Sequence, residues 1–250
     1  MTDHSAPHHL AIIMDGNRRW AYRKNKSTQS GHDSGSRIIQ SIAERAFDRG
    51  VKWLTLFAFS SENWKRSSLE LKGIMAVLQH YLKNEFYVLA ENNIKLRVIG
   101  DLTGFSAEIK RLLQESVEKT KHNTGLNLTI ALGYGGHADI AYAAQQIAKA
   151  VKEGALDATQ IDREIIKKNL MTADLPSVDL LLRTGGELRV SNFLLWDLAY
   201  AELFFSDALW PDFTPDQLDD IIDQFVGRNR RFGGGTGVDP IIVRAKTVNS

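Results

Sequence analysis

Cysteine is absent from this 250-residue chain. Its absence excludes disulfide bonds, catalysis by a thiol and zinc sites with cysteine ligands. An excess of charge of one sign is also missing, because 31 Lys and Arg residues nearly balance 30 Asp and Glu residues and leave a formal net charge of +1. The chain therefore lacks the overall basic field that is typical of nucleic-acid-binding proteins, and we expect no nucleic-acid partner.

Long apolar runs are absent as well. No run approaches the roughly 20 residues that a membrane-spanning helix needs, and residues 1–8 lack the apolar core of a signal peptide. We therefore expect a soluble, cytoplasmic protein. The length suits one α/β domain, which at this size buries roughly 75% of the surface of the unfolded chain, although length alone also permits two small domains.

Apolar strand patterns alternate with helical patterns along the chain. We predict strands near residues 10–14, 52–59, 94–99, 126–132, 178–183 and 201–205. We predict helices near residues 34–49, 69–91, 106–121, 138–152, 161–170 and 215–229, and a further one near 191–198. This alternation indicates a single α/β domain with about six mostly parallel strands and helices on both faces of the sheet. We expect the domain to cover 9–232, with a disordered tail over 1–8 and a flexible tail over 233–250.

The segment from His9 to Trp20 carries the most informative chemistry. An apolar run short enough for a buried strand ends in the sequence DGNRR at 15–19. A carboxylate, a glycine and arginines at the end of a parallel strand suit Mg²⁺ and a phosphorylated ligand. Glycine lets the backbone approach an anion closely, and arginine grips phosphate through two hydrogen bonds. A strand followed by an ordinary polar turn is the alternative interpretation.

Two further apolar strands end in side chains of the same kind. Residues 57–66 read FAFSSENWKR and pass into hydroxyl, amide, aromatic and basic side chains. Residues 179–193 read DLLLRTGGELRVSNF and place Arg183 and Arg189 on either side of a glycine pair. Ligands of open α/β sheets bind outside the carboxyl ends of the strands. We therefore predict that the three strand ends share one pocket.

These segments resemble the signature blocks of the cis-prenyltransferase family. The blocks are MDGNRRWA at 14–21, GHDSG at 31–35, FAFSSENWKR at 57–66 and RTGGELRVSNFLLW at 183–196. They stand in the family's order, and the resemblance extends from about His9 to Phe232. It implies an enzyme that condenses isopentenyl diphosphate repeatedly onto farnesyl diphosphate to make a long-chain polyprenyl (undecaprenyl) diphosphate, the lipid-carrier precursor for cell-wall glycan synthesis. It also implies a hydrophobic tunnel for the growing chain.

The resemblance further implies roles for individual residues. Asp15 and Asn63 are the catalytic candidates, and Asp15 and Glu202 are the candidate ligands of Mg²⁺. An amide has no useful basicity near neutral pH, so we expect Asn63 to orient the substrate while the departing pyrophosphate or Asp15 accepts the proton. The candidate substrate-binding residues are Gly16, Asn17, Arg18, Arg19, Trp20 and His32 for the primer diphosphate, Arg183, Arg189, Val190 and Ser191 for isopentenyl diphosphate, and Ser60, Ser61, Glu62, Trp64 and Arg66 on the second strand end.

The chain departs from the family pattern at some of these blocks. Thr28 stands where an arginine commonly helps bind diphosphate, and Leu188 stands where a histidine is frequent. Arg18 occupies a position that glycine often holds, and we interpret it as an offset for the cation missing at Thr28. These departures affect the expected affinity for the primer.

The resemblance also implies partners. We expect a homodimer that contacts the membrane surface transiently to release its lipid product. Arg228, Arg230 and Arg231 are candidates to reach the diphosphate site of the partner chain.

Two other functions are compatible with parts of the sequence. Gly133, Gly135 and Ala138 match the pattern G-x-G-x-x-A between a strand and a helix, which favours a nicotinamide-dependent oxidoreductase. A non-catalytic partner subunit of a prenyltransferase is the second alternative. Such a subunit is expected to lose Asp15 or the Ser-Glu-Asn-Trp block, and this chain keeps both.

An aspartate-rich segment, DDIID at 219–223, is similar to the motif of trans-type prenyl synthases. Those enzymes use two such motifs in an all-helical bundle, which the alternation of strands and helices contradicts. We expect a solvated helix face instead.

Overall fold

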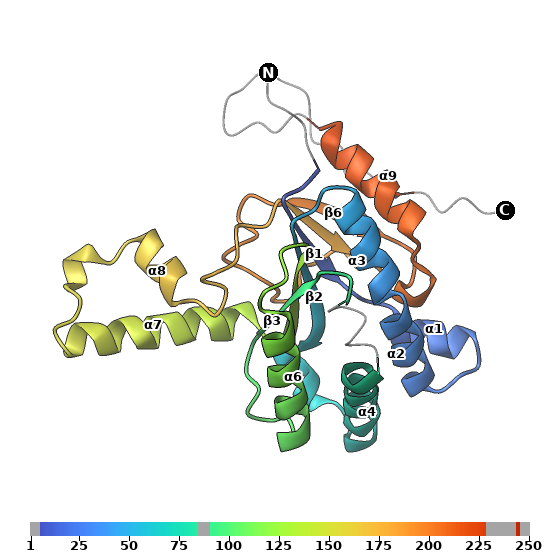
Figure 1. Cartoon of the computed structure of the whole chain (residues 1–250), viewed down its shortest axis with the longest axis horizontal. Helices are drawn as coiled ribbons and strands as arrows, with labels where there is room; N and C mark the ends of the chain where they lie inside the picture. Colours follow the sequence, from blue (N-terminus) through green and yellow to red (C-terminus); the bar gives the residue numbers. More distant parts are fainter. Residues whose placement is uncertain (1–5, 85–90, 229–243, 246–250) are drawn as a thin grey trace.

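The computed structural model describes residues 6–84, 91–228 and 244–245. Over these residues the chain forms an α/β domain around one sheet with the strand order β3-β4-β2-β1-β5-β6-β7, in which every pair of neighbours is parallel (Figure 1). The strands are β1 (His9–Ile13), β2 (Trp53–Ser60), β3 (Lys95–Ile99), β4 (Asn127–Tyr134), β5 (Leu180–Arg183), β6 (Glu202–Ser206) and β7 (Arg244–Ala245). The six predicted strands and their parallel arrangement are confirmed.

Most of the predicted helices are present, but the helix over Asn17–Arg23 and residues 28–33 of the next helix lie outside every predicted range. The described helices are α1 (Asn17–Arg23), α2 (Thr28–Arg37), α3 (Ile39–Asp48), α4 (Ser68–Asn84), α6 (Ala107–Thr120), α7 (Gly136–Lys152), α8 (Arg163–Asn169) and α9 (Pro215–Val226). The helix predicted over 34–49 is interrupted at Ile38, between α2 and α3. The helix predicted over 191–198 is wrong, because Ser191, Asn192 and Leu194 have positive φ angles that a right-handed helix excludes. Residues 85–90 of the helix predicted over 69–91 lie outside the described residues.

Both predicted tails include residues that contact the sheet. The backbone carbonyl of His8 accepts hydrogen bonds from the N–H groups of Lys52 and Trp53, at 3.1 and 2.9 Å. Near the other end, β7 pairs with Phe205 and Ser206 of β6. The structure thus describes residues 6–8 and 244–245, while the disordered tail over 1–8 and the flexible tail over 233–250 stay predictions. Residues 1–5, 229–243 and 246–250 lie outside the described part of the chain.

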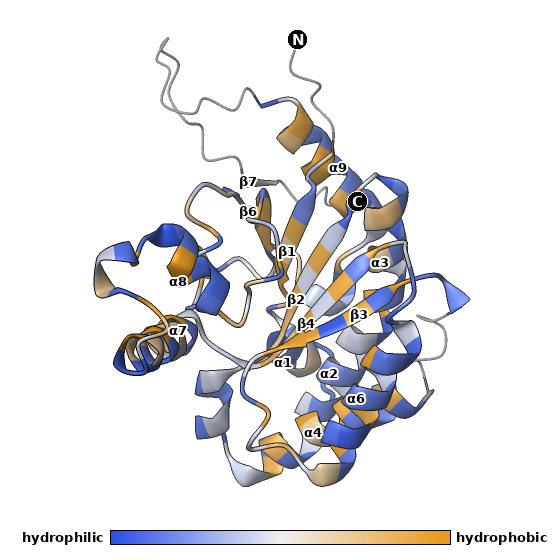
Figure 2. Ribbon diagram, turned by 60° about the vertical axis from the view of Figure 1, so that its left-hand side comes forward, coloured by the Kyte–Doolittle hydropathy of each residue, from blue (hydrophilic) through white to orange (hydrophobic). Residues whose placement is uncertain are grey.

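The two faces of the sheet are covered differently (Figure 2). On one face, α3 and α9 pack through apolar residues such as Ile42 and Leu218 against alternate strand residues such as Leu54. On the other face, a segment over 170–201 without α-helix supplies the cover, with residues such as Phe193. The arm formed by α7 and α8 extends away from the sheet (Figure 1). Helices therefore cover the second face less completely than the alternation predicts.

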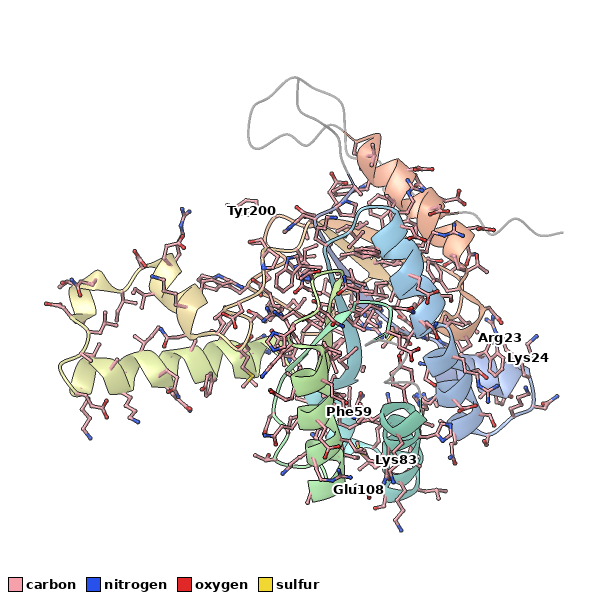
Figure 3. All side chains as sticks on the ribbon, viewed as in Figure 1. Arg23, Lys24, Phe59, Lys83, Glu108 and Tyr200 are labelled. Carbon is pink, nitrogen blue, oxygen red and sulfur yellow. The ribbon has the colours of Figure 1, made fainter. Side chains whose placement is uncertain are left out.

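At the carboxyl end of the sheet, α4 and α6 form an apolar pair over Phe59 of β2 and Leu132 of β4. Lys83 and Glu108 join these helices through an ion pair of 2.6 Å (Figure 3). None of the described helices is long and apolar enough to cross a membrane.

The aspartates of the DDIID segment lie on α9. Asp219 and Asp223 form ion pairs with Arg49 of α3, and Asp219 also pairs with Arg45. The expected solvated face therefore holds for Asp220 and Asp223, which are both exposed, whereas Asp219 is half-buried between α9 and α3.

Histidine 9 opens β1 and is completely buried. Its Nδ1 lies 2.8 Å from the carbonyl oxygen of Pro176, and its Nε2 lies 2.8 Å from the Thr55 hydroxyl. Because a carbonyl can only accept, the neutral ring donates from Nδ1 and accepts at Nε2. Burial lowers the pKa of His9 from 6.5 to about 4.

This pKa predicts a loss of stability in mild acid. The unfolded chain binds a proton at His9 between pH 6.5 and about 4, where the folded chain does not, so stability falls as the pH decreases through this range. We expect His9 to lower the free energy of unfolding by about 2 kcal/mol between pH 7 and pH 5. Urea unfolding of the wild type and of His9→Gln at both pH values measures the difference. Equal decreases in the two proteins would contradict the prediction.

Candidate active site

The carboxyl ends of β1, β2 and β5 meet at one cavity of about 830 Å³. The strand register causes this meeting, because Ile13 lies opposite both Phe57 and Arg183. The predicted shared pocket is confirmed. Thirteen of the predicted site residues line it: Asp15, Gly16, Asn17, Arg18, Arg19, His32, Ser60, Glu62, Asn63, Arg66, Arg183, Arg189 and Ser191.

Asp15 and Arg183 form the centre of this cavity. The Arg183 side chain is only 4% exposed, and its Nη2 donates to Oδ2 of Asp15 at 2.8 Å. Its Nη1 donates to the Ser191 hydroxyl and to the Arg189 carbonyl, each at 2.6 Å. Arg183 therefore holds the loop after β5 against Asp15, and its guanidinium is largely occupied within the protein.

The second oxygen of Asp15 faces a more exposed cation. Oδ1 of Asp15 lies 3.3 Å from Nη2 of Arg19, whose side chain is 42% exposed. Burial alone would raise the pKa of Asp15, but the hydrogen bond and the charge of Arg183, together with Arg19, outweigh it. The pKa of Asp15 therefore lies below its ordinary value, and the carboxylate is charged at neutral pH.

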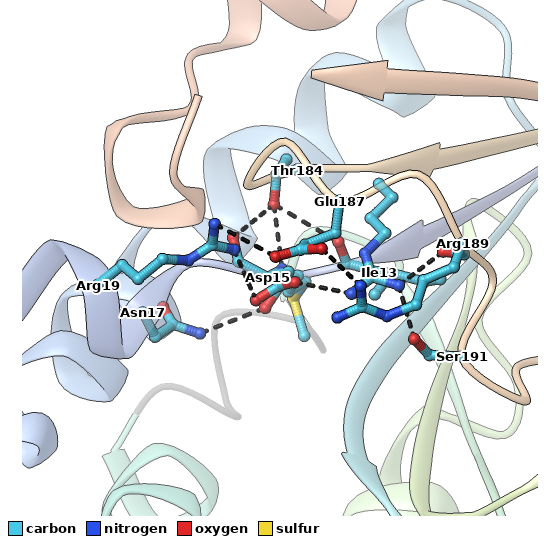
Figure 4. Close-up of polar contacts among 10 residues, drawn as sticks. Ile13, Asp15, Asn17, Arg19, Thr184, Glu187, Arg189 and Ser191 are labelled. Carbon is cyan, nitrogen blue, oxygen red and sulfur yellow. Dashed lines mark hydrogen bonds and ion pairs between the residues drawn. The ribbon is translucent and has the colours of Figure 1, made fainter. Parts of the chain in front are cut away.

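The loop after β1 depends on a glycine. Gly16 has a φ angle of +112°, and a Cβ atom at this position would lie 2.9 Å from Leu209. Both the backbone conformation and the close approach therefore exclude other side chains. The Thr184 hydroxyl donates to the Asp15 carbonyl at 2.8 Å and accepts from the Asp15 N–H at 3.1 Å, which fixes the loop beside β5 (Figure 4).

The second strand end is a short 3₁₀ helix over Ser61–Lys65. Ser60 and Asn63 cap it reciprocally, and Oδ1 of Asn63 accepts the Ser60 N–H at 3.0 Å. Arg66 follows and forms an ion pair with Glu70 one helical turn later. The cap fixes the orientation of the Asn63 amide, in agreement with a role in orientation.

His32 reaches the cavity from α2. Burial, with a contribution from the nearby charge of Arg66, lowers the pKa of His32 to about 4, so the ring is neutral at pH 7. Its Nε2 is buried and has no hydrogen-bond partner among the described residues. A buried polar atom of this kind is costly unless a ligand supplies the missing bond, which favours a hydrogen bond to a bound ligand.

Four predicted residues near the cavity do not line it: Trp20, Ser61, Trp64 and Val190. Trp20 is buried and its indole N–H donates to Asp212 at 2.7 Å. Trp64 makes edge contacts with Phe59 and Phe105. These two aromatic residues therefore support the site through packing.

Glu202 is not brought to the cavity within one chain. It begins β6 opposite Leu180, which lies opposite Leu10 at the amino end of the sheet. Asp15 follows the carboxyl end, five residues after Leu10, so the two carboxylates are separated by about 16 Å along the strand direction. Glu202 instead pairs with Arg228 at 2.7 Å. Within one chain Glu202 therefore lies apart from Asp15, and its role as a ligand of Mg²⁺ stays a prediction.

The residues that depart from the family pattern, and the arginines near the carboxyl terminus, differ in whether they line the cavity. Arg18 lines the cavity and is exposed, whereas Thr28 and Leu188 do not line it. Arg228 is occupied by Glu202. Arg230 and Arg231 lie outside the described residues, so their reach to a partner remains a prediction.

Sequence reasoning missed several residues of the site. Glu70, Glu187 and Asn192 line the cavity, and Thr184 fixes its loop. Glu70 could be identified from the sequence, because it stands four residues after Arg66 on a predicted helix and can form an ion pair with it. The other three lie inside the RTGGELRVSNF block, where residue type alone did not separate them from their neighbours.

A second, apolar cavity of about 110 Å³ adjoins the first. Met14, Asn17, His32, Ala58 and Ile74 line both. The second cavity continues between the sheet and the helix pair α4 and α6, where its lining includes Met75, Leu78, Leu82, Leu113, Ile130 and Leu132. A ligand with a charged head and a hydrocarbon tail therefore fits across the junction of the two cavities.

The Gly133 segment does not offer a dinucleotide site. At the start of α7, the N–H of Gly136 donates to the Asn192 carbonyl at 2.7 Å, and the N–H of His137 donates to the Asn192 side chain at 2.8 Å. A pyrophosphate needs these backbone donors. Because the protein itself occupies them, the oxidoreductase alternative loses its only support.

The acidic residues of the cavity can bind a divalent cation only if a bound phosphorylated molecule supplies further oxygen donors. No group of three or more potential metal ligands occurs among the described residues. Asp15 is ionised, and its side chain is 30% exposed toward the cavity. This fits Mg²⁺ sites in which one or two carboxylates act with phosphate oxygens and water.

Comparisons with known proteins agree with this geometry. A family model described as putative undecaprenyl diphosphate synthase matches residues 13–233. The chain is 47% identical over 228 residues to the Pasteurella multocida ditrans,polycis-undecaprenyl-diphosphate synthase ((2E,6E)-farnesyl-diphosphate specific), a match that covers 91% of this chain and 95% of that protein.

Two solved structures have the same fold. Lavandulyl diphosphate synthase from Lavandula x intermedia, in complex with dimethylallyl diphosphate, matches with a TM-score of 0.89 and 35% identity, covering 92% of this chain and 99% of that one. A probable undecaprenyl diphosphate synthase from Campylobacter jejuni matches with a TM-score of 0.76 and 36% identity, covering 91% and 99%.

Proposed function

Because this chain belongs to the undecaprenyl diphosphate synthase family, we propose that it condenses isopentenyl diphosphate repeatedly onto farnesyl diphosphate. The chain is a prenyltransferase, and its product is undecaprenyl diphosphate, a lipid-carrier precursor for cell-wall glycan. The observation that carries this assignment is the arginine-lined cavity at three strand ends with an apolar cavity leading away from it. The presence of Asp15, Asn63 and the arginines in one cavity argues against a non-catalytic partner subunit.

The chemistry requires stabilisation of a leaving diphosphate. Breaking the allylic carbon–oxygen bond places additional charge on a group that is already anionic. Two unit charges 4 Å apart interact by about 1 kcal/mol in water but by about 4 kcal/mol at an effective dielectric constant of 20. Cations that are fixed in a cavity therefore stabilise the leaving group better than solvent does.

The two cavities support a proposed position for each substrate. Asn17 and His32 stand at the entrance to the apolar cavity, so the primer places its hydrocarbon tail there and its diphosphate beside these residues, Arg18 and Arg19. Arg189, which pairs with Glu187, and Ser191, whose hydroxyl accepts from Arg183, lie on the β5 side, and we assign them to isopentenyl diphosphate. The neutral His32 ring supplies its unused Nε2 position to the primer diphosphate.

Asn63 orients isopentenyl diphosphate but does not accept the proton that the condensed product loses. The Asn63 side chain is fixed by its cap with Ser60, and an amide cannot act as a base near neutral pH. Asp15 is ionised and lines the same cavity. The departing pyrophosphate or Asp15 therefore accepts the proton from the condensed product.

The cavity also holds a carboxylate that would bind Mg²⁺ together with the substrate. Asp15, with the substrate diphosphate, is the residue that would hold the ion. When bound, Mg²⁺ neutralises charge on the diphosphate and orients it.

Homodimerisation and membrane contact extend the proposal. On β6, Leu203 is 42% exposed and lies opposite Leu181, on the face that helices cover least. Tyr200 nearby is 83% exposed (Figure 3). We propose that these side chains contribute to the interface of the dimer, and a polyprenyl product needs an apolar acceptor such as a membrane surface. Sedimentation of the purified protein tests the dimer, and the mass of a single chain would contradict it.

Incubation with labelled isopentenyl diphosphate, farnesyl diphosphate and Mg²⁺ tests the function directly. We expect chain elongation, and the length of the extracted lipid identifies the product. Omission of the primer is the matched control. An absence of label in the lipid fraction, together with saturable NADH binding in a parallel titration, would favour the oxidoreductase alternative instead.

A further inference from the structure

Asn192 joins three segments beside the cavity, and none of the roles above uses its side chain. Its Oδ1 accepts the His137 N–H at 2.8 Å, and its carbonyl accepts the Gly136 N–H at 2.7 Å. Its Nδ2 donates to Oε1 of Glu62 at 2.8 Å. Asn192 thereby ties the loop that carries Arg189 and Ser191 both to the first turn of α7 and to the 3₁₀ helix after β2.

The loop has a backbone conformation that few residues adopt. The φ angles of Ser191 and Asn192 are +47° and +63°. Asparagine tolerates this left-handed region better than most residues other than glycine. Two consecutive residues in this region persist only when their surroundings hold them. The three hydrogen bonds of Asn192 and the bond from Arg183 to the Ser191 hydroxyl provide this support.

The three segments are in direct contact at Gly135. A Cβ atom on Gly135 would lie 2.4 Å from the Ser61 hydroxyl and 2.7 Å from Nδ2 of Asn192. A side chain at Gly135 would therefore displace the Ser61 hydroxyl and the Asn192 amide. Glu62 completes the contact as a charged acceptor: burial opposes its ionisation, but the hydrogen bonds from Asn192 and from the turn outweigh burial and lower its pKa.

We propose that Asn192 and Glu62 form a latch that sets the distance between the two halves of the isopentenyl diphosphate site. One half carries Arg189 and Ser191 after β5, and the other carries Asn63 and Arg66 after β2. Asn192 is a positioning residue, because it acts through these groups and not on the substrate. The inference rests on the proposed function in assigning isopentenyl diphosphate to this side of the cavity.

Exchanging the donor and the acceptor of the hydrogen bond between Asn192 and Glu62 tests the latch. Asn192→Asp keeps the size of the side chain and the acceptor for His137, but it loses the donor to Glu62 and places two carboxylates together. We expect the KM for isopentenyl diphosphate to rise about tenfold, and the KM for farnesyl diphosphate to change less than about twofold. In the double variant Asn192→Asp/Glu62→Gln, the glutamine amide donates to the new carboxylate. We expect this variant to return the KM for isopentenyl diphosphate to within about twofold of Glu62→Gln alone.

Hydrogen–deuterium exchange without substrate provides a readout that does not depend on catalysis. We expect faster exchange over 136–138 and 189–194 in Asn192→Asp, and recovery in the double variant. If the wild type does not elongate the primer, the proposed function fails, while the exchange cycle still tests the latch. A lack of rescue by Glu62→Gln in exchange or in KM would overturn the latch. An equal rise of both KM values with a lowered Tm would overturn the positioning role.

Discussion

Replacement of Asp15 with asparagine is expected to lower kcat by about 10³-fold, which corresponds to about 4 kcal/mol of barrier. Asparagine keeps the size of the side chain and can still accept from Arg183, but it removes the charge. Among the described residues that line the cavity, Asp15 is the carboxylate held directly by the buried Arg183 guanidinium, at 2.8 Å. The loss therefore removes a charge from the centre of the site while the packing around it is retained.

The dependence of activity on Mg²⁺ shows whether Asp15→Asn lowers kcat through the loss of a metal ligand or through a general disturbance of the fold. If Asp15 holds the ion with the diphosphate, Asp15→Asn raises the concentration of Mg²⁺ needed for half-maximal activity by about tenfold or more. Asp220→Asn is the matched control, because Asp220 is exposed on α9 and lies outside the cavity. Steady-state kinetics over a Mg²⁺ titration checks both variants. A kcat near the wild-type value for Asp15→Asn would remove Asp15 from the mechanism.

The position of the site follows from strand patterns that the sequence displays. The apolar runs before Asp15, Ser60 and Thr184 each predict a buried strand, and parallel strands bring their carboxyl ends to one edge of the sheet. The same rule places Glu202 at the opposite edge, since Glu202 lies at the start of its predicted strand. The resemblance suggested Glu202 as a metal ligand, and strand polarity, which the sequence already contained, argues against it within one chain.

Other features depend on packing that residue types do not reveal. Arg183 and Arg189 are both arginines and stand six positions apart. The Arg183 side chain is nevertheless 4% exposed, whereas that of Arg189 is 60% exposed. The apolar sequence after Ser191 suits a helix, but the positive φ angles of Ser191, Asn192 and Leu194 come from contacts with distant segments. The function of Asn192 depends on the same contacts, so sequence reasoning could not identify it.

Arg183→Lys is expected to lower kcat/KM for isopentenyl diphosphate by about 10²-fold or more, although it retains the charge. The guanidinium reaches Asp15, the Ser191 hydroxyl and the Arg189 carbonyl at the same time. A lysine ammonium is a compact donor on a flexible chain and cannot span these three acceptors. The loop that carries Arg189 and Ser191 therefore loses its fixed position relative to Asp15.

The pH profile of the variant distinguishes this account from a simple loss of binding. In the wild type, burial favours protonation of Asp15, and the hydrogen bond and charge of Arg183 overcome it and lower the pKa. With the bond weakened, the pKa of Asp15 rises, so the acidic limb of kcat/KM moves to higher pH. Arg37→Lys is the matched control, because Arg37 is 77% exposed and, among the residues that the structure describes, forms an ion pair with Asp33 on its own helix. Because removal of one partner from a buried ion pair can cost about 3–5 kcal/mol, circular dichroism must first show that the variant is folded at the assay temperature. An acidic limb at the wild-type position in folded Arg183→Lys would show that Arg183 does not control the ionisation of Asp15.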